Sequence, residues 1–125
     1  MAKLNFELHH SSLMITDLEA STRFYTEIVG LQQMERPDLG FPGAWFQLGE
    51  NQQLHILKLH NIDPTRGRPE HGGQDRHVAL TVDQFDTVRD SLDAHDVFYS
   101  MSKSGRKALF FRDLDANAIE IIGRD

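Results

Sequence analysis

Three histidines and one glutamate stand at matching positions in the two halves of this 125-residue chain. His10 and His55 are 45 positions apart, and His77 and Glu120 are 43 positions apart. A carboxylate with aliphatic neighbours that faces three imidazoles is costly to bury unless a cation compensates its charge. Nitrogen and carboxylate donors suit Fe, Ni, Co or Zn better than Mg or Ca. The four residues therefore predict a divalent metal site whose remaining coordination positions are open for water or substrate.

The matching positions carry this interpretation, because a single histidine is more often a hydrogen-bonded core or rim residue. His9 is the alternative to His10 as a ligand, because a shift of one residue in the register of the first strand would turn His9 inward instead. The correspondence of Leu13 with Leu80 and of Ile15 with Val82 argues against that shift.

An internal repeat with an offset of 67 residues positions these side chains. Each half shows the order strand, helix and three strands. Thr16 and Glu19 are predicted to form a capping box at the start of the first helix, Gly30 to end it, and Asp83 to cap the second helix. The expected strands are residues 6–15, 31–35, 44–48 and 53–59 in the first half, and 77–82, 97–101, 107–112 and 118–122 in the second.

The fold class that follows is α+β, with two βαβββ modules in a single domain of residues 1–125. Module one covers about residues 5–60, a Gly- and Pro-rich connector about 61–75, and module two about 76–125. Alternation along 77–82 puts Val78, Leu80 and Val82 against the helix and His77 on the opposite face. We expect the metal-binding side chains to face a cleft between the modules.

Composition excludes several classes of function. The formal net charge of −6 opposes binding to nucleic acid or to an anionic membrane surface. No apolar stretch approaches about 18 residues and no secretory signal precedes the first strand, so a cytoplasmic location is expected. The chain has no cysteine, which excludes disulfides, thiolate nucleophiles and Cys-based metal sites.

Four segments of the sequence resemble the vicinal oxygen chelate superfamily, which includes glyoxalase I, fosfomycin-resistance enzymes, bleomycin-resistance proteins and extradiol dioxygenases. These segments are residues 10–25, 53–57, 77–83 and 110–120. The resemblance implies an open, cup-shaped mixed sheet built from the two modules. It places His10, His55, His77 and Glu120 at the family's metal-ligand positions. It also implies a homodimer, in which each site is built either within one chain or across the two.

The leading functional hypothesis from this resemblance is a glyoxalase-like lyase or isomerase acting on a small molecule. The metal would bind neighbouring oxygens of the substrate, and Glu120 or His55 would move a proton through an enediolate. One alternative is an Fe(II) extradiol dioxygenase acting on a catechol, with His10, His77 and Glu120 as ligands. Another is a metal-free protein that sequesters a drug. The candidate substrate-pocket residues are Trp45, Phe46, Phe98 and Phe110.

Overall fold

Two four-stranded sheets form the framework of the protein, and the computed structural model describes residues 2–124. The first sheet has the order β1-β4-β3-β2, with β1 parallel to β4 and the other neighbours antiparallel. Its elements are β1 (His10–Ile15), α1 (Leu18–Arg23), the π-helical turn η1 (Phe24–Val29), β2 (Gln32–Met34), β3 (Gly43–Leu48) and β4 (Gln52–Lys58).

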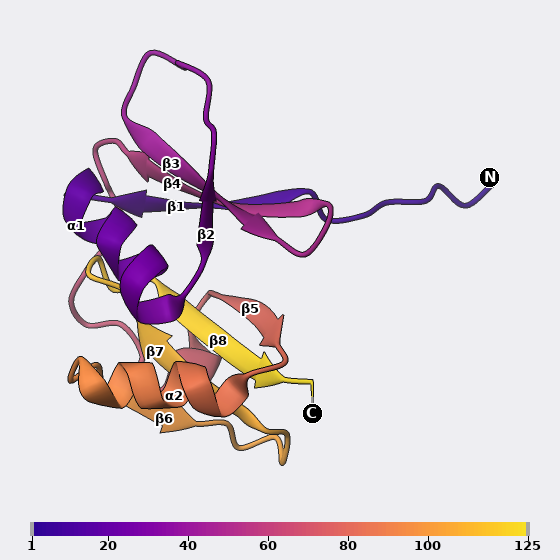
Figure 1. Cartoon of the computed structure of the whole chain (residues 1–125), viewed down its shortest axis with the longest axis vertical. Coiled ribbons are helices and arrows are strands. Elements are labelled where there is room, and N and C mark those ends of the chain that lie inside the picture. The colour runs from indigo at the N-terminus through magenta and orange to yellow at the C-terminus, as the bar shows by residue number, and fades with distance from the viewer. Residues whose placement is uncertain (1, 125) are drawn as a thin grey trace.

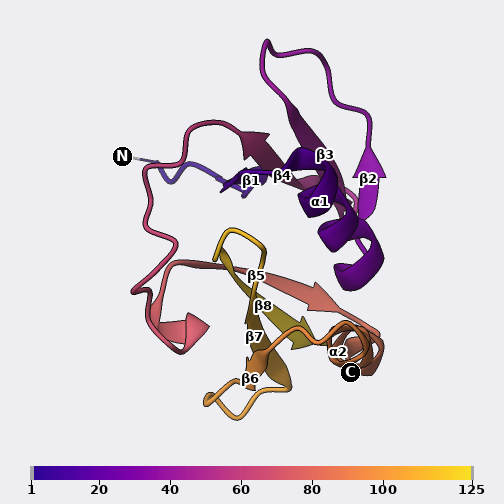
Figure 2. The ribbon, with the colours of Figure 1, turned by 90° about the vertical axis from the view of Figure 1, so that its left-hand side faces the viewer.

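The second sheet repeats this topology with the order β5-β8-β7-β6. Its elements are the short 3₁₀ turn η2 (Gly72–Gln74), β5 (His77–Val82), α2 (Phe85–Ala94), β6 (Tyr99–Met101), β7 (Ala108–Arg112) and β8 (Ala118–Gly123). Figures 1 and 2 show the two sheets as separate units, joined by the connector between β4 and β5. The α+β class and the repeated module are therefore confirmed, and the sheets do not close on each other within the chain.

The helix ends differ in detail from the predicted caps. Asp17, rather than Thr16, is the N-cap of α1, and its carboxylate accepts a hydrogen bond from the backbone N–H of Ala20 at 3.1 Å. The N-cap of α2 is Gln84, while the predicted cap Asp83 pairs with Arg124 at 2.8 Å. Both predicted caps were therefore wrong by one residue.

Gly30 ends the first helical segment as predicted. Its φ of 94° lies in the left-handed region, which a glycine adopts without a Cβ clash.

A single hydrophobic core joins the two modules through their helices. It contains residues from the helix-facing sides of both sheets together with helix residues: Ile15, Phe24, Tyr25, Val29, Ala44, Phe46, Leu54, Ile56, Phe85, Val88, Leu92, Leu109, Phe111, Ile119 and Ile121. Each sheet therefore has a core face and, on the other side, a face that we call its open face.

Hydrogen bonds reinforce the contact between the modules. The Thr16 hydroxyl donates to the carboxylate of Asp115 at 2.5 Å, and the Tyr25 hydroxyl donates to Asp113 at 2.5 Å. The Asn117 side-chain amide donates to the backbone oxygen of Met14 at 2.9 Å. These bonds connect the end of β1 and the start of η1 to the turn between β7 and β8. They therefore hold the two modules together at the side where the helices pack.

The segment before β1 extends away from both modules (Figure 1). The first strand begins at His10 rather than at Phe6, and the side chains of Leu4, Phe6 and Leu8 are exposed. No helix within residues 2–124 is long and apolar enough to cross a membrane.

Candidate functional site

The open face of the first sheet carries a stack of three aromatic rings. His55 lies directly opposite Trp45 in the β3–β4 register and opposite Ser12 in the β1–β4 register. Its ring is 4.3 Å from the indole, centroid to centroid, with an interplanar angle of 6°. His10 stacks at 4.2 Å and 17°. His10 and His55 therefore meet on one face, as the predicted register required.

His55 is buried at 6% exposure, and this environment disfavours its charged form. Burial lowers the pKa of His55 to about 4, and the nearby His10, His9 and Arg36 act in the same direction. Its Nε2 atom lies 2.8 Å from Oε1 of Gln53. At neutral pH the imidazole is therefore uncharged, which is the form that binds a metal or accepts a proton.

The open face of the second sheet carries the matching pair. Glu120 lies between Ala79 of β5 and Phe110 of β7 in the strand register, and it is 2% exposed. One carboxylate oxygen, Oε1, is 3.4 Å from Nε2 of His77. The other, Oε2, is 3.3 Å from Nη2 of Arg106. A buried carboxylate is costly without such cationic or hydrogen-bonding partners.

The structure brings the four predicted ligands together as two pairs rather than as one group. Among residues 2–124, no three His, Asp or Glu side chains lie close enough to hold a metal ion together. The donor chemistry of each pair nevertheless fits a transition metal, because neutral imidazole nitrogens and a carboxylate are its common protein ligands. Each pair therefore contains two of the four donors that the sequence predicts.

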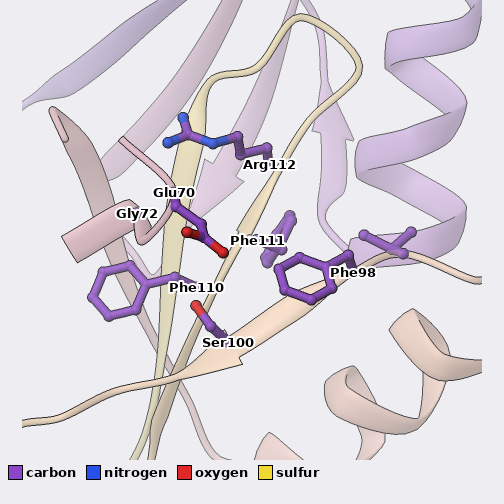
Figure 3. Close-up of a pocket in the computed structure, with 8 residues that line it drawn as sticks. Glu70, Gly72, Phe98, Ser100, Phe110, Phe111 and Arg112 are labelled. Atoms are coloured by element: carbon purple, nitrogen blue, oxygen red, sulfur yellow. The ribbon is translucent and has the colours of Figure 1, made fainter. Parts of the chain in front are cut away.

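Two of the four aromatic residues proposed for the substrate pocket share a pocket. Phe98 and Phe110 line it together with Glu70 and Ser100 (Figure 3). The Phe110 ring also contacts the His77 ring edge-on, with centroids 5.2 Å apart. The pocket therefore lies beside the His77–Glu120 pair.

The other two aromatic residues lie in the first module. Trp45 covers His55 on the open face. Phe46 is fully buried on the opposite face of β3, where its ring packs 5.6 Å from that of Tyr25. Phe46 belongs to the core and does not line the predicted pocket, because neighbouring residues of a strand point to opposite faces.

Two arginines at the open faces were not predicted as site residues from the sequence. Arg106 lies in the turn before β7, where nothing in the sequence indicated its contact with Glu120. Arg36 follows β2 and packs over the ring of Phe41, with Cζ 4.8 Å from the ring centroid. The only sequence feature that could have indicated the position of Arg36 was Gly43, because the absence of a side chain there leaves room for the guanidinium.

Comparisons with known proteins agree with the repeated topology. A curated relative, Glyoxylase I 4 of Arabidopsis thaliana, is 26% identical over 124 residues, covering 94% of this chain and 71% of the relative. Lactoylglutathione lyase of Agrobacterium tumefaciens superposes with a TM-score of 0.68 at 21% identity, covering 98% and 96% of the two chains. TnmS3, an antibiotic binding protein of Streptomyces sp. CB03234, gives 0.74 at 18% identity, covering 99% and 100%.

The family model of the Glyoxalase/Bleomycin resistance protein/Dioxygenase superfamily matches residues 7–121, which span both sheets and all four predicted ligands. The chain belongs to this superfamily.

Proposed function

We propose that this protein is a metal-dependent enzyme of the glyoxalase type that acts on a small molecule as a lyase or isomerase. The observation that carries the proposal is the buried Glu120 beside His77, repeated by the His10–His55 pair at the equivalent place in module one. The substrate would have two neighbouring oxygens, and a bound Fe, Ni, Co or Zn ion would polarise them as a Lewis acid.

We further propose that a homodimer completes the site, with His10 and His55 of one copy facing His77 and Glu120 of the other. Two features support this arrangement. Both pairs lie on open faces, away from the core that joins the modules. The side chains of His10 and His77 also remain accessible to a second copy.

Within such a site, Glu120 or His55 would move the proton next to the substrate carbonyl. The depressed pKa of His55 leaves its ring uncharged at neutral pH, so its free nitrogen would either hold the metal or accept the proton. Glu120 suits proton transfer because its carboxylate is shielded from water by its neighbours. Arg106, next to Oε2 of Glu120, would hold that carboxylate in position.

Metal uptake is the first test. The protein is stripped with a chelator, dialysed against Fe(II), Ni(II), Co(II) or Zn(II), and analysed for retained metal. We expect about one ion per chain in the wild type and a large loss in Glu120→Gln, because a ligand is removed. The control Glu50→Gln alters an exposed turn carboxylate and should retain the metal. Absence of stoichiometric metal from the folded wild type would overturn the proposal.

Mixing two inactive variants tests the shared site. His10→Ala and Glu120→Gln are unfolded together and refolded as a mixture. In a shared arrangement each mixed dimer has one site with all native ligands, so about a quarter of the wild-type sites should return. Sites built within single chains would give no recovery.

Activity separates the reaction types. A 2-oxoaldehyde–thiol adduct should turn over in the metal-loaded protein, and Glu120→Gln should lose that turnover. Cleavage of a catechol with consumption of oxygen would instead identify a dioxygenase.

A second candidate function, metal-free sequestration of an aromatic compound, is favoured by the pocket that Phe98 and Phe110 line. Tight binding of such a compound without metal uptake would support it.

A further inference from the structure

Three buried nitrogens of the first module lack a hydrogen-bond partner within residues 2–124. They are Nε and Nη2 of Arg36 and Nε1 of Trp45. Arg36 also forms no ion pair with any residue in this range. Buried donors in folded proteins are nearly always satisfied, and an unpaired buried charge is especially costly. These groups therefore call for an acceptor.

Arg36 and Trp45 lie on the same face of β3. Trp45 is opposite Met34 in the β2–β3 register, and Arg36 follows Met34 by two residues. A Cβ atom on Gly43, two residues before Trp45, would be 3.0 Å from both Cζ and Nε of Arg36. The guanidinium therefore lies on Gly43, next to Trp45 along the strand. Because Trp45 stacks on His55, both donors belong to the open face that carries the predicted metal ligand.

The identity of the unpartnered atoms indicates the ligand. Nε and Nη2 form one edge of the guanidinium, and their parallel N–H bonds match the two oxygens of a carboxylate. The indole N–H is also a donor and never an acceptor. All three groups therefore require acceptor oxygens, and the positive charge of Arg36 favours an anion.

We propose that Arg36 and Trp45 form a carboxylate-binding site beside His55. Taken with the proposed function, on which this second step rests, the substrate carries a carboxylate in addition to the two neighbouring oxygens that reach the metal. The three nitrogens are buried. The segment of residues 35–42, which holds Arg36 and Phe41 and projects from the first sheet between β2 and β3, therefore shifts to admit the ligand (Figure 1).

The fluorescence of Trp45 provides a direct assay, because it is the only tryptophan of the chain. The full-length protein is titrated with propionate and, as a matched neutral ligand, with propionamide, before and after metal loading. We expect a saturable fluorescence change with propionate and none with propionamide. Arg36→Met should weaken propionate binding by about 10-fold or more, as for a lost charged hydrogen bond. The control Arg89→Met, at a partly exposed arginine of α2 that pairs with Asp86, should bind as the wild type does.

Two further variants keep the proposal testable if Arg36→Met does not fold. Arg36→Lys retains the charge but loses the two-pronged edge, and it should bind propionate more weakly than the wild type. Trp45→Phe retains a ring on His55 but loses the N–H. Because this variant lacks the fluorescent side chain, its propionate binding is followed by NMR through the Nε–H resonance of Arg36. We expect it to bind propionate more weakly than the wild type.

The outcomes separate this inference from the proposed function. Carboxylate binding without metal uptake would contradict the proposed metal enzyme and support this site. Metal uptake with equal responses to propionate and propionamide would overturn this site alone. A change of oligomeric state in Arg36→Met, with unchanged propionate binding, would also overturn it, because the donors would then serve an interface between copies.

Discussion

Replacing Tyr25 with phenylalanine tests how the two modules are held together. The Tyr25 side chain is fully buried, and its hydroxyl donates to Oδ2 of Asp113 at 2.5 Å. Asp113 also accepts from the side-chain amide of Asn117 and from two backbone N–H groups. Removing the hydroxyl takes away one hydrogen bond to a charged acceptor, so the free energy of unfolding should fall by about 1.5–3 kcal/mol. That is a large share of the stability of an ordinary domain.

The pH dependence of this loss distinguishes the hydrogen bond from simple packing. Burial raises the pKa of Asp113, while its bonds to Tyr25 and Asn117 oppose that rise. An acid whose pKa is raised by folding contributes stability at low pH and loses it as the pH rises through the folded-state pKa. In Tyr25→Phe the pKa of Asp113 rises further, so the variant should lose more stability at pH 7 than near pH 3.5.

Urea denaturation at fixed protein concentration, at both pH values, measures these differences. Tyr99→Phe is the matched control, since Tyr99 is the only other tyrosine and its hydroxyl makes a longer, exposed bond to Asp93 at 3.3 Å. It should change stability little at either pH. Equal losses in the two variants, or a Tyr25→Phe loss that does not grow with pH, would refute the reasoning.

Three further predictions follow from single sites. Asp75→Asn should cost about 1.5–3 kcal/mol of unfolding free energy in urea denaturation at pH 7, because the Asp75 carboxylate accepts charge-assisted hydrogen bonds from Arg68 and Arg112. Those arginines hold the pKa of Asp75 well below its usual range, so the difference from wild type should shrink progressively as the pH falls below about 4, where the unfolded chain takes up the proton first. The His55 ring should titrate near pH 4 in NMR, and an ordinary value near 6.5 would contradict its buried environment. Gly30→Ala should lower stability by about 1–2 kcal/mol because of its left-handed backbone, and an unchanged melting temperature would contradict this.

The repeated fold could be read from the sequence because local patterns determine it. Alternating side chains set β5 to residues 77–82, and Gly30 marked the end of the first helical segment. The caps were harder to predict, because several polar residues compete at each helix start. Thr16 resembles a cap in sequence, but its hydroxyl donates to Asp115, which lies 99 residues away.

The candidate site could be predicted in part because local sequence patterns also determine which face of a strand each side chain occupies. Strand parity correctly paired His10 with His55 and His77 with Glu120. It could not determine how the pairs lie relative to each other, because that depends on packing between the modules. Phe46 was misassigned because its residue type alone does not show which face of a strand is buried, and alternation lets only one of the neighbours Trp45 and Phe46 face the pocket. Arg36 was missed because its position depends on contacts with Phe41 and Gly43.

The separation of core faces from open faces has an evolutionary consequence. Phe46, Leu54 and Phe111 pack into the shared core, whereas Trp45, His55 and Phe110 project from the reverse sides of the same three strands. Substitutions on the reverse sides can alter ligand preference while leaving the shared interior intact. Such a scaffold can diversify its chemistry with little risk to folding, and duplication of one module would have provided two such surfaces at once.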